Sequence, residues 1–80
     1  MNAIIASKLS PTQAIRKIGQ LVRLGPGMHV ALGIQDFADE GELGIVVNVR
    51  WTADGWPQFT VGFRLTIYEP LSEFEIEAVK

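Results

Sequence analysis

Residues 44–67 read GIVVNVRWTADGWPQFTVGFRLTI, and this stretch decides the fold. Apolar residues alternate with other residues on both sides of the Thr-Ala-Asp-Gly segment at positions 52–55. Alternation with a period of two is typical of half-buried antiparallel strands, and Asp-Gly is typical of the turn that joins them. The sequence therefore predicts a domain built around a central hairpin.

The burial pattern selects the register of this hairpin. Pairing Trp51 with Trp56 would place apolar residues opposite polar ones, and a slip of one residue moves every side chain to the other face. The slipped register leaves Trp56 in a five-residue loop, 52–56, as a partly exposed aromatic outside the ladder, and makes Trp51 a core residue. It predicts three pairs on the buried face: Val49 with Phe59, Val47 with Val61, and Ile45 with Phe63.

The same alternation extends to both sides of the hairpin. It predicts strands at 29–34 and 73–78, and it continues through the second hairpin strand as far as Ile67. A short strand and a tight turn at 70–72 come before the last strand. In that last segment Ser72 and Glu75 also form a capping box, which favours a short helix. The order of the elements favours the strand.

A helix is predicted before the strands. Ser10 can cap it, Pro11 occupies its first position, and Gln13 completes a capping box. Apolar residues follow at helical spacing until Gly25 and Pro26 end the pattern. These signals predict an amphipathic helix over 11–24. For residues 2–6 the pattern leaves a short strand and a frayed tail open.

Composition restricts the class of protein. The chain has 80 residues, 48% of them hydrophobic, with one His and no Cys. We expect one globular domain over 1–80, with an N-terminal segment and helix in 1–26 and a β-barrel in 27–80. The missing Cys exclude disulfides, thiolate zinc sites and cysteine nucleophiles. A small domain without such stabilising links favours a homo-oligomer.

No motif for catalysis, a cofactor or a metal is present. The chain lacks a phosphate loop, a dinucleotide fingerprint, zinc spacing and a serine-nucleophile motif. We therefore expect a non-catalytic protein with no cofactor. Residues 1–6 lack the basic start of a signal peptide, and no apolar run approaches the roughly 18 residues that span a bilayer. The expected location is the cytoplasm, with no membrane partner.

Charge is divided along the chain. Residues 1–34 hold four basic residues and no acidic ones, whereas 35–80 hold three basic and nine acidic residues. The predicted outer helix face is either a phosphate-contacting or docking surface or an ordinary solvated one. The acidic loop is a solvated loop, a surface for a basic partner or a calcium site, although its spacing lacks the pattern of a dedicated calcium loop. The three alternating glutamates in the last strand either protect a strand edge or present a row of negative charge to a cationic protein surface. The residues are Gln13, Arg16, Lys17, Gln20 and Arg23 on the helix, Asp36, Asp39, Glu40 and Glu42 in the loop, and Glu73, Glu75 and Glu77 in the strand.

The order of elements over about 27–79 resembles a Src-homology-3-like small barrel with a helix added at its N-terminus. The resemblance is carried by Gly27-Met28-His29-Val30, Gly41-Glu42-Leu43-Gly44-Ile45-Val46, Phe59-Thr60-Val61-Gly62-Phe63 and Tyr68-Glu69-Pro70-Leu71-Ser72-Glu73-Phe74. The fold class implied is mainly β (α+β), with a five-stranded antiparallel barrel.

Within this class the chain is distantly similar to the type II plasmid dihydrofolate reductases. Leu65-Thr66-Ile67-Tyr68 matches a Val-Gln-Ile-Tyr segment that lines the central pore of those tetramers. The resemblance implies a homo-oligomeric pore lined by Thr66, Ile67 and Tyr68. Thr66 replaces the ligand-holding glutamine, and 29–34 contain no lysine where that family has one. These departures argue against reductase activity.

The outward side of the hairpin supplies the main candidate site. Polar residues there lie beside aromatic ones, and aromatic residues and Arg dominate interface hot spots. The sequence therefore predicts a small protein-binding accessory or inhibitor. The alternatives are nucleic-acid binding through Arg16, Lys17 and Arg23, and a small-ligand pore in a homo-oligomer. The partner-binding residues are Trp56, Tyr68, Arg50, Arg64 and Gln58, with Asn48 and Thr60 as neighbours.

Overall fold

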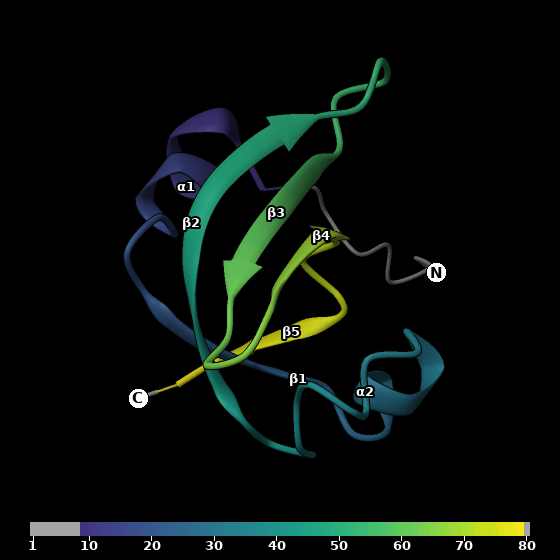
Figure 1. Cartoon of the computed structure of the whole chain (residues 1–80). Coiled ribbons are helices and arrows are strands. Elements are labelled where there is room, and N and C mark those ends of the chain that lie inside the picture. The colour runs from purple at the N-terminus through teal and green to yellow at the C-terminus, as the bar shows by residue number, and fades with distance from the viewer. Residues whose placement is uncertain (1–8, 80) are drawn as a thin grey trace, which may run out of the picture.

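Five strands and two short helices make up residues 9–79, the part of the chain that the computed structural model describes. The strands form one antiparallel sheet in the order β4-β3-β2-β1-β5 (Figure 1). The prediction of a small β-rich domain is confirmed. Residues 2–6 lie outside the described residues. The elements are α1 (Pro11–Arg16), β1 (Leu21–Leu24), α2 (Met28–Ala31), β2 (Leu43–Trp51), β3 (Pro57–Gly62), β4 (Ile67–Leu71) and β5 (Ile76–Ala78).

Helix α1 begins as predicted but is much shorter. The Ser10 hydroxyl accepts from the Gln13 N–H at 3.2 Å, and the Gln13 side chain accepts from the Ser10 N–H at 3.0 Å. The prediction of a helix to residue 24 is wrong, because α1 ends at Arg16 and Gly19, at φ +88°, turns the chain. Residues 21–24 then alternate between exposed and buried as strand β1. The spacing of their apolar residues fits a helix and a strand equally well, and they form a strand because they pair with β2 and β5.

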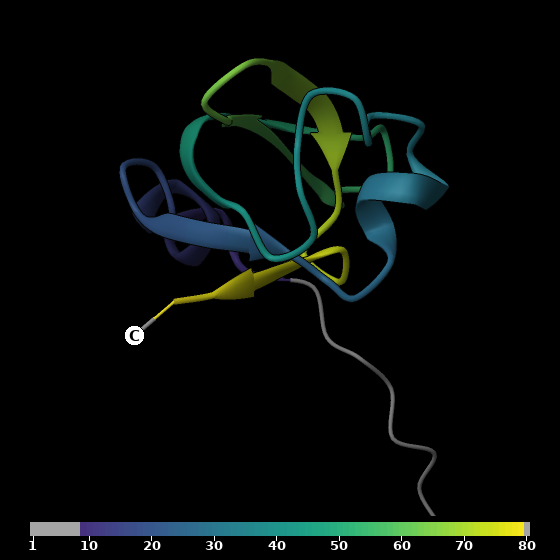
Figure 2. The same ribbon diagram turned by 60° about the horizontal axis from the view of Figure 1, so that its bottom comes forward.

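The strand predicted over 29–34 is also wrong. Gly27, at φ +73°, is the N-cap of the short helix α2. Backbone hydrogen bonds form within this segment: the Ala31 N–H donates to the Gly27 carbonyl and the Leu32 N–H to the Met28 carbonyl. Val30 is 58% exposed, Ile34 is buried in the core, and Leu32 packs against the core while partly exposed. Because these backbone groups are satisfied within the segment, no neighbouring strand is needed. Figure 2 shows α2 to one side of the strands, away from α1.

A β-bulge changes which residues of strand β2 point into the core. Val49 pairs with Phe59 as predicted, and Trp56 lies in the 52–56 loop outside the ladder, also as predicted. The other two predicted pairs are wrong: Val46, not Val47, lies opposite Val61, and Ile45 lies opposite Gly62. The ladder shifts between Val46 and Asn48, and the extra residue turns the preceding part of β2 over. Val46 is consequently buried, while Ile45 and Val47 are 46% and 49% exposed; Trp51 is 39% exposed instead of core.

Gly44 permits the new register. A Cβ at this position would lie 2.6 Å from Cγ1 of Val61 and 2.8 Å from Cε1 of Phe63. Real Cβ contacts are not this short, so β2 can approach these two side chains only with glycine at position 44. The inner side of β2 is therefore formed by Gly44, Val46 and Val49.

The C-terminal third differs from prediction in detail. The long second strand is divided into β3 and β4, so that Leu65 and Ile67 are 60% and 69% exposed instead of buried. The last strand, β5, is confirmed but short. The turn predicted at 70–72 is wrong, because β4 continues through Pro70 at the edge of the sheet, where a missing N–H is tolerated. The turn lies at 73–75, where Glu75 accepts from the Ser72 N–H at 2.7 Å.

The core lies on the inner side of the curved sheet. Phe59, Val61 and Leu71 have no exposed surface, and α1 contributes one buried residue. All remaining buried hydrophobics join the same cluster. Its members are Ala14, Val22, Leu24, Ile34, Ala38, Val46, Val49, Phe59, Val61, Phe63 and Leu71.

Candidate protein-docking face

One row of residues crosses four strands on the outer side of the sheet. Leu21 of β1 pairs with Ile45 of β2, Ile45 pairs with Gly62 of β3, and Gly62 pairs with Ile67 of β4. Directly paired residues share a face, and their chain neighbours on β1, β2 and β3 are core residues. The row therefore points outward. Leu21 is 45% exposed, Ile45 46% and Ile67 69%.

Two further residues of β2 extend this row. Leu43 and Val47 are 45% and 49% exposed on the same side as Ile45. Gly62 forms a recess between Ile45 and Ile67, since it has no side chain. We call this surface the apolar half-face; it consists of Leu21, Leu43, Ile45, Val47, Gly62 and Ile67.

Polar residues occupy the same side of the sheet beyond the bulge. Asn48 pairs with Thr60, and Arg50 pairs with Gln58. The Thr60 hydroxyl donates to Glu69 at 2.6 Å, and the Arg50 guanidinium forms an ion pair with the same carboxylate. The structure thus brings together four residues predicted to be neighbours. We call Asn48, Arg50, Gln58, Thr60 and Glu69 the polar half-face.

Glu69 is the member of this surface that sequence reasoning missed. The Thr60 hydroxyl, together with the Arg50 guanidinium, holds the pKa of Glu69 below its usual range. Its position in β4, two residues after Ile67, could have indicated an outward side chain. The sequence does not indicate its contacts with Thr60 and Arg50, because they depend on the pairing of a third strand with the hairpin.

The other predicted partner-binding residues lie apart from this surface. Arg64 is in the turn after β3, where its backbone N–H donates to Glu42 at 3.3 Å. Trp56 is half-buried, and its ring lies 6.0 Å from that of Phe74. Tyr68 packs against the core. The five predicted residues therefore do not form one patch.

The predicted pore-lining residues also face different ways. Ile67 points outward, whereas Tyr68, next in the strand, packs against the core. Successive side chains of a strand point to opposite faces. Thr66 precedes β4 and is half-buried, and its carbonyl accepts from the Phe63 N–H at 2.7 Å. Of the three, Ile67 alone belongs to the apolar half-face.

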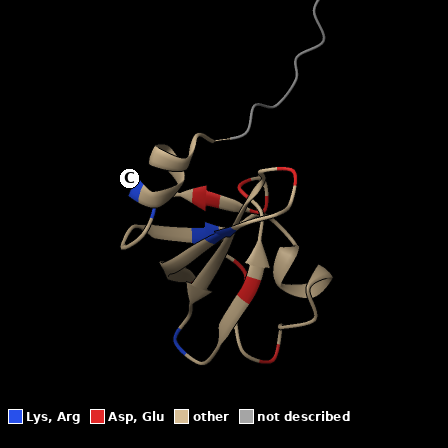
Figure 3. Ribbon diagram, turned by 90° about the horizontal axis from the view of Figure 1, so that it is seen from above, with Lys and Arg blue, Asp and Glu red and all other residues tan. Residues whose placement is uncertain are grey.

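The predicted basic helix face is wrong, because the helix ends too early. Arg16 is the last residue of α1, Lys17 is its C-cap, and Arg23 lies in β1 opposite Leu43 and Glu77. Gln20 also falls outside α1, and its carbonyl accepts from the Val46 N–H. Figure 3 shows basic and acidic segments distributed over different strands and loops. The described residues therefore present no helix face that carries all three cations.

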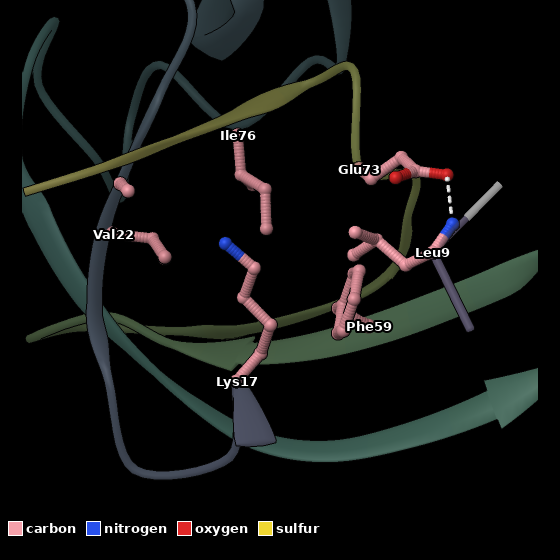
Figure 4. Close-up of a pocket in the computed structure, with 7 residues that line it drawn as sticks. Leu9, Lys17, Val22, Phe59, Glu73 and Ile76 are labelled. Atoms are coloured by element: carbon pink, nitrogen blue, oxygen red, sulfur yellow. Dashed lines mark hydrogen bonds between the residues drawn. The ribbon is translucent and has the colours of Figure 1, made fainter. Parts of the chain in front are cut away.

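A cavity of about 100 Å³ lies between α1, β1 and the turn before β5. Lys17 extends into it, with its ammonium group toward Val22 and Ile76 (Figure 4). Glu73 accepts a hydrogen bond from the Leu9 N–H at 3.3 Å on the far side. Pockets for small ligands measure about 300 to 1,000 Å³, so this cavity is too small for such a ligand.

The acidic segments are arranged differently from the prediction. The three alternating glutamates do not share a strand, because Glu73 and Glu75 lie in the turn and only Glu77 lies in β5. Part of the acidic loop, 39–42, lines a shallow open hollow with Leu43 and Arg64. Within residues 9–79 no group of three or more His, Cys, Asp or Glu side chains is placed to hold a metal ion. No helix in this described range is long and apolar enough to cross a membrane.

Comparison of the chain with protein-family models, with curated proteins and with solved structures found no match. The functional argument therefore depends on the geometry of the described residues.

Proposed function

We propose that this chain is a non-catalytic protein-binding module with a Src-homology-3-like small barrel, which docks a protein partner on its apolar half-face. The observation that carries the proposal is the row formed by Leu21, Ile45, Gly62 and Ile67 across four strands. The strand order is compatible with the barrel, because β1 pairs with both the β2-β3-β4 meander and the last strand.

Five large apolar side chains of the apolar half-face are 45–69% exposed. Single exposed hydrophobic residues are normal on any protein, but contiguous ones mark interaction sites. Full burial of a Leu, Ile or Val side chain contributes about 1.5–3 kcal/mol, so each half-exposed member leaves about 1 kcal/mol unused. The five large side chains together leave about 5 kcal/mol that a docked partner can recover.

The sequence of β2 is that of a strand covered on both sides. Ile45, Val46 and Val47 are consecutive, so both faces of the strand are apolar at this point. Continuous apolar runs are typical of strands buried on both faces, whereas a strand with one solvated face shows alternation. Val46 is covered by the core, while Ile45 and Val47 are left half-exposed. A partner seated on the outer side would complete this burial.

The polar half-face supplies the polar border that such an interface needs. Specific interfaces combine an apolar centre with a polar, partly solvated rim. Arg50 and Glu69 remain 62% and 46% exposed although they are paired with each other. They can therefore exchange hydrogen bonds with a partner and contribute to its orientation.

Site-specific photo-crosslinking in the host cell tests this proposal. A benzophenone amino acid at position 67 should capture a discrete protein, whereas the same probe at position 30 should not. Val30, like Ile67, is an exposed aliphatic residue, but it lies on α2, outside the apolar half-face. A second substitution, Ile45→Lys, should remove the adduct at position 67.

Four results would overturn the proposal. They are no adduct at position 67, equal adducts at both positions, an adduct that persists with Ile45→Lys while the variant remains folded, and capture of nucleic acid alone at position 67. The last result would return the basic residues to the centre of the functional argument.

A further inference from the structure

We infer that the protein docked on the apolar half-face is a second copy of this chain, packed sheet against sheet about a two-fold axis parallel to β2 and β3. The inference rests on the proposed function and names its partner. It follows from the order of the large side chains and the glycine in the row, and from the distribution of charge on the face.

The row is complementary to itself. Across the strands it reads Leu21, Ile45, Gly62, Ile67, so that a large side chain and a recess lie side by side at its centre. A two-fold axis that runs along the strands between β2 and β3 exchanges the positions of these two strands. It places Ile45 of one copy over Gly62 of the other, and Leu21 over Ile67. Every large side chain then meets either a recess or another apolar side chain.

The recess is not required by the fold of a single chain. A Cβ at Gly62 would lie 3.7 Å from Cγ1 of Val47, which is an ordinary van der Waals contact, and its φ is not in the left-handed region. Gly44, on the inner side of β2, is different, since a Cβ there would meet Val61 at 2.6 Å. The space above Gly62 is therefore available to a side chain from outside.

Charge on the face also fits a second copy. The same axis places Arg50 of the second copy over Gln58 of β3, the strand next to β4, which carries Glu69. Arg50 and Glu69 balance each other, and at the opposite border Arg23 pairs across the strands with Glu77. Two identical faces therefore meet without net like-charge repulsion.

The size of the face limits how tightly two copies can bind. The four strands hold 24 residues, four in β1, nine in β2, six in β3 and five in β4, and at about 3.3 Å by 4.8 Å per residue they cover about 380 Å² per copy in projection. The pair would bury about 760 Å², which is below the roughly 1,200 Å² of stable interfaces. We therefore expect a weak, reversible dimer that forms at hundreds of micromolar.

Sedimentation equilibrium of the full chain between about 10 μM and 1 mM measures this dimer. Gly62→Ala should fill the recess and weaken dimerisation about tenfold without lowering the melting temperature. Gly25→Ala is the matched control, because Gly25 also has only ordinary Cβ contacts and lacks a left-handed φ, yet it lies outside the face. This variant should dimerise like the unmodified chain.

Disulfide trapping tests the arrangement itself. Because the chain contains no cysteine, only the introduced residues can form a disulfide. Oxidation of a mixture of Leu21→Cys and Ile67→Cys chains should produce a mixed dimer. Each variant alone should crosslink much less, because the axis does not place either residue over itself. Equal crosslinking of Leu21→Cys alone would overturn the two-fold arrangement.

The two proposals fail in different ways. In one case the chain stays monomeric and folded at 1 mM, while the probe at position 67 captures a protein of another mass. This result overturns the proposal of a second copy and retains the proposal of a docking face. An adduct of twice the mass of the chain supports both. A monomer without any adduct at position 67 overturns both.

Discussion

The two sides of strand β2 have similar sequences and very different surroundings. Gly44, Val46 and Val49 face inward and are buried, whereas Leu43, Ile45 and Val47 face outward and are 45–49% exposed. The inner residues lie against the core, while about half of the surface of each outer side chain stays exposed. The amino-acid composition of the two sides therefore does not determine which one is buried. The residues packed against each side do.

The two glycines beside these surfaces differ in the same way. A Cβ at Gly44 would collide with Val61 and Phe63, whereas a Cβ at Gly62 would make an ordinary contact with Val47. The first glycine is required by packing inside the molecule. The second leaves open space on the outer side. A glycine thus indicates close packing at one position and an open surface at the other.

A charge placed on each side of β2 should show the largest difference. Val46→Asp buries a carboxylate at a position with no exposed surface, and we expect it to lower the free energy of unfolding by about 4 kcal/mol or more. Val47→Asp, next in the chain but half-exposed, should lower it by less than about 1 kcal/mol. Urea denaturation followed by tryptophan fluorescence measures both. Equal losses would mean that the outer side is packed in the single chain.

Substitution of the two glycines should have an intermediate effect. Gly44→Ala forces β2 away from Val61 and Phe63, and overpacking of this kind costs about 1–3 kcal/mol. Gly62→Ala should leave the unfolding free energy of the monomer unchanged or raise it, since alanine restricts the unfolded chain more than glycine does. Denaturation at concentrations below those of dimerisation separates the two cases. A destabilising Gly62→Ala would mean that the recess is needed for folding.

The ion pair of the polar half-face should have the smallest effect, and it should depend on pH. Because the pKa of Glu69 in the folded chain is below its ordinary value of 4.5, its ionised form stabilises the fold above that pH, and this contribution is lost as the pH falls through the lowered pKa. Glu69→Gln should reduce stability slightly at neutral pH. The difference from the unmodified chain should shrink below about pH 4.5 in thermal unfolding curves. A difference that does not change between pH 3 and 7 would contradict this assignment.

Features that depend on neighbouring residues were predictable from the sequence. The capping box of Ser10 and Gln13, the 52–56 loop and the pairing of Val49 with Phe59 all involve residues close together in the chain or across one turn. The polar half-face was largely predictable for the same reason, since it lies between the bulge and that turn, where the predicted register holds. Glu69 was missed because it comes from a third strand.

The tertiary structure alone decided where α1 ends, how 28–34 folds and which side of β2 is buried. Residues 21–24 fit a helical and a strand period equally, and their pairing with β2 and β5 selects the strand. Residues 45–47 are all apolar, so the alternation of apolar and polar residues does not show which face of the strand is buried here. The bulge after Val46 and the close approach at Gly44 set which side is buried, because they place Gly44 and Val46 against Val61 and Phe63. The apolar half-face is what this choice leaves outside.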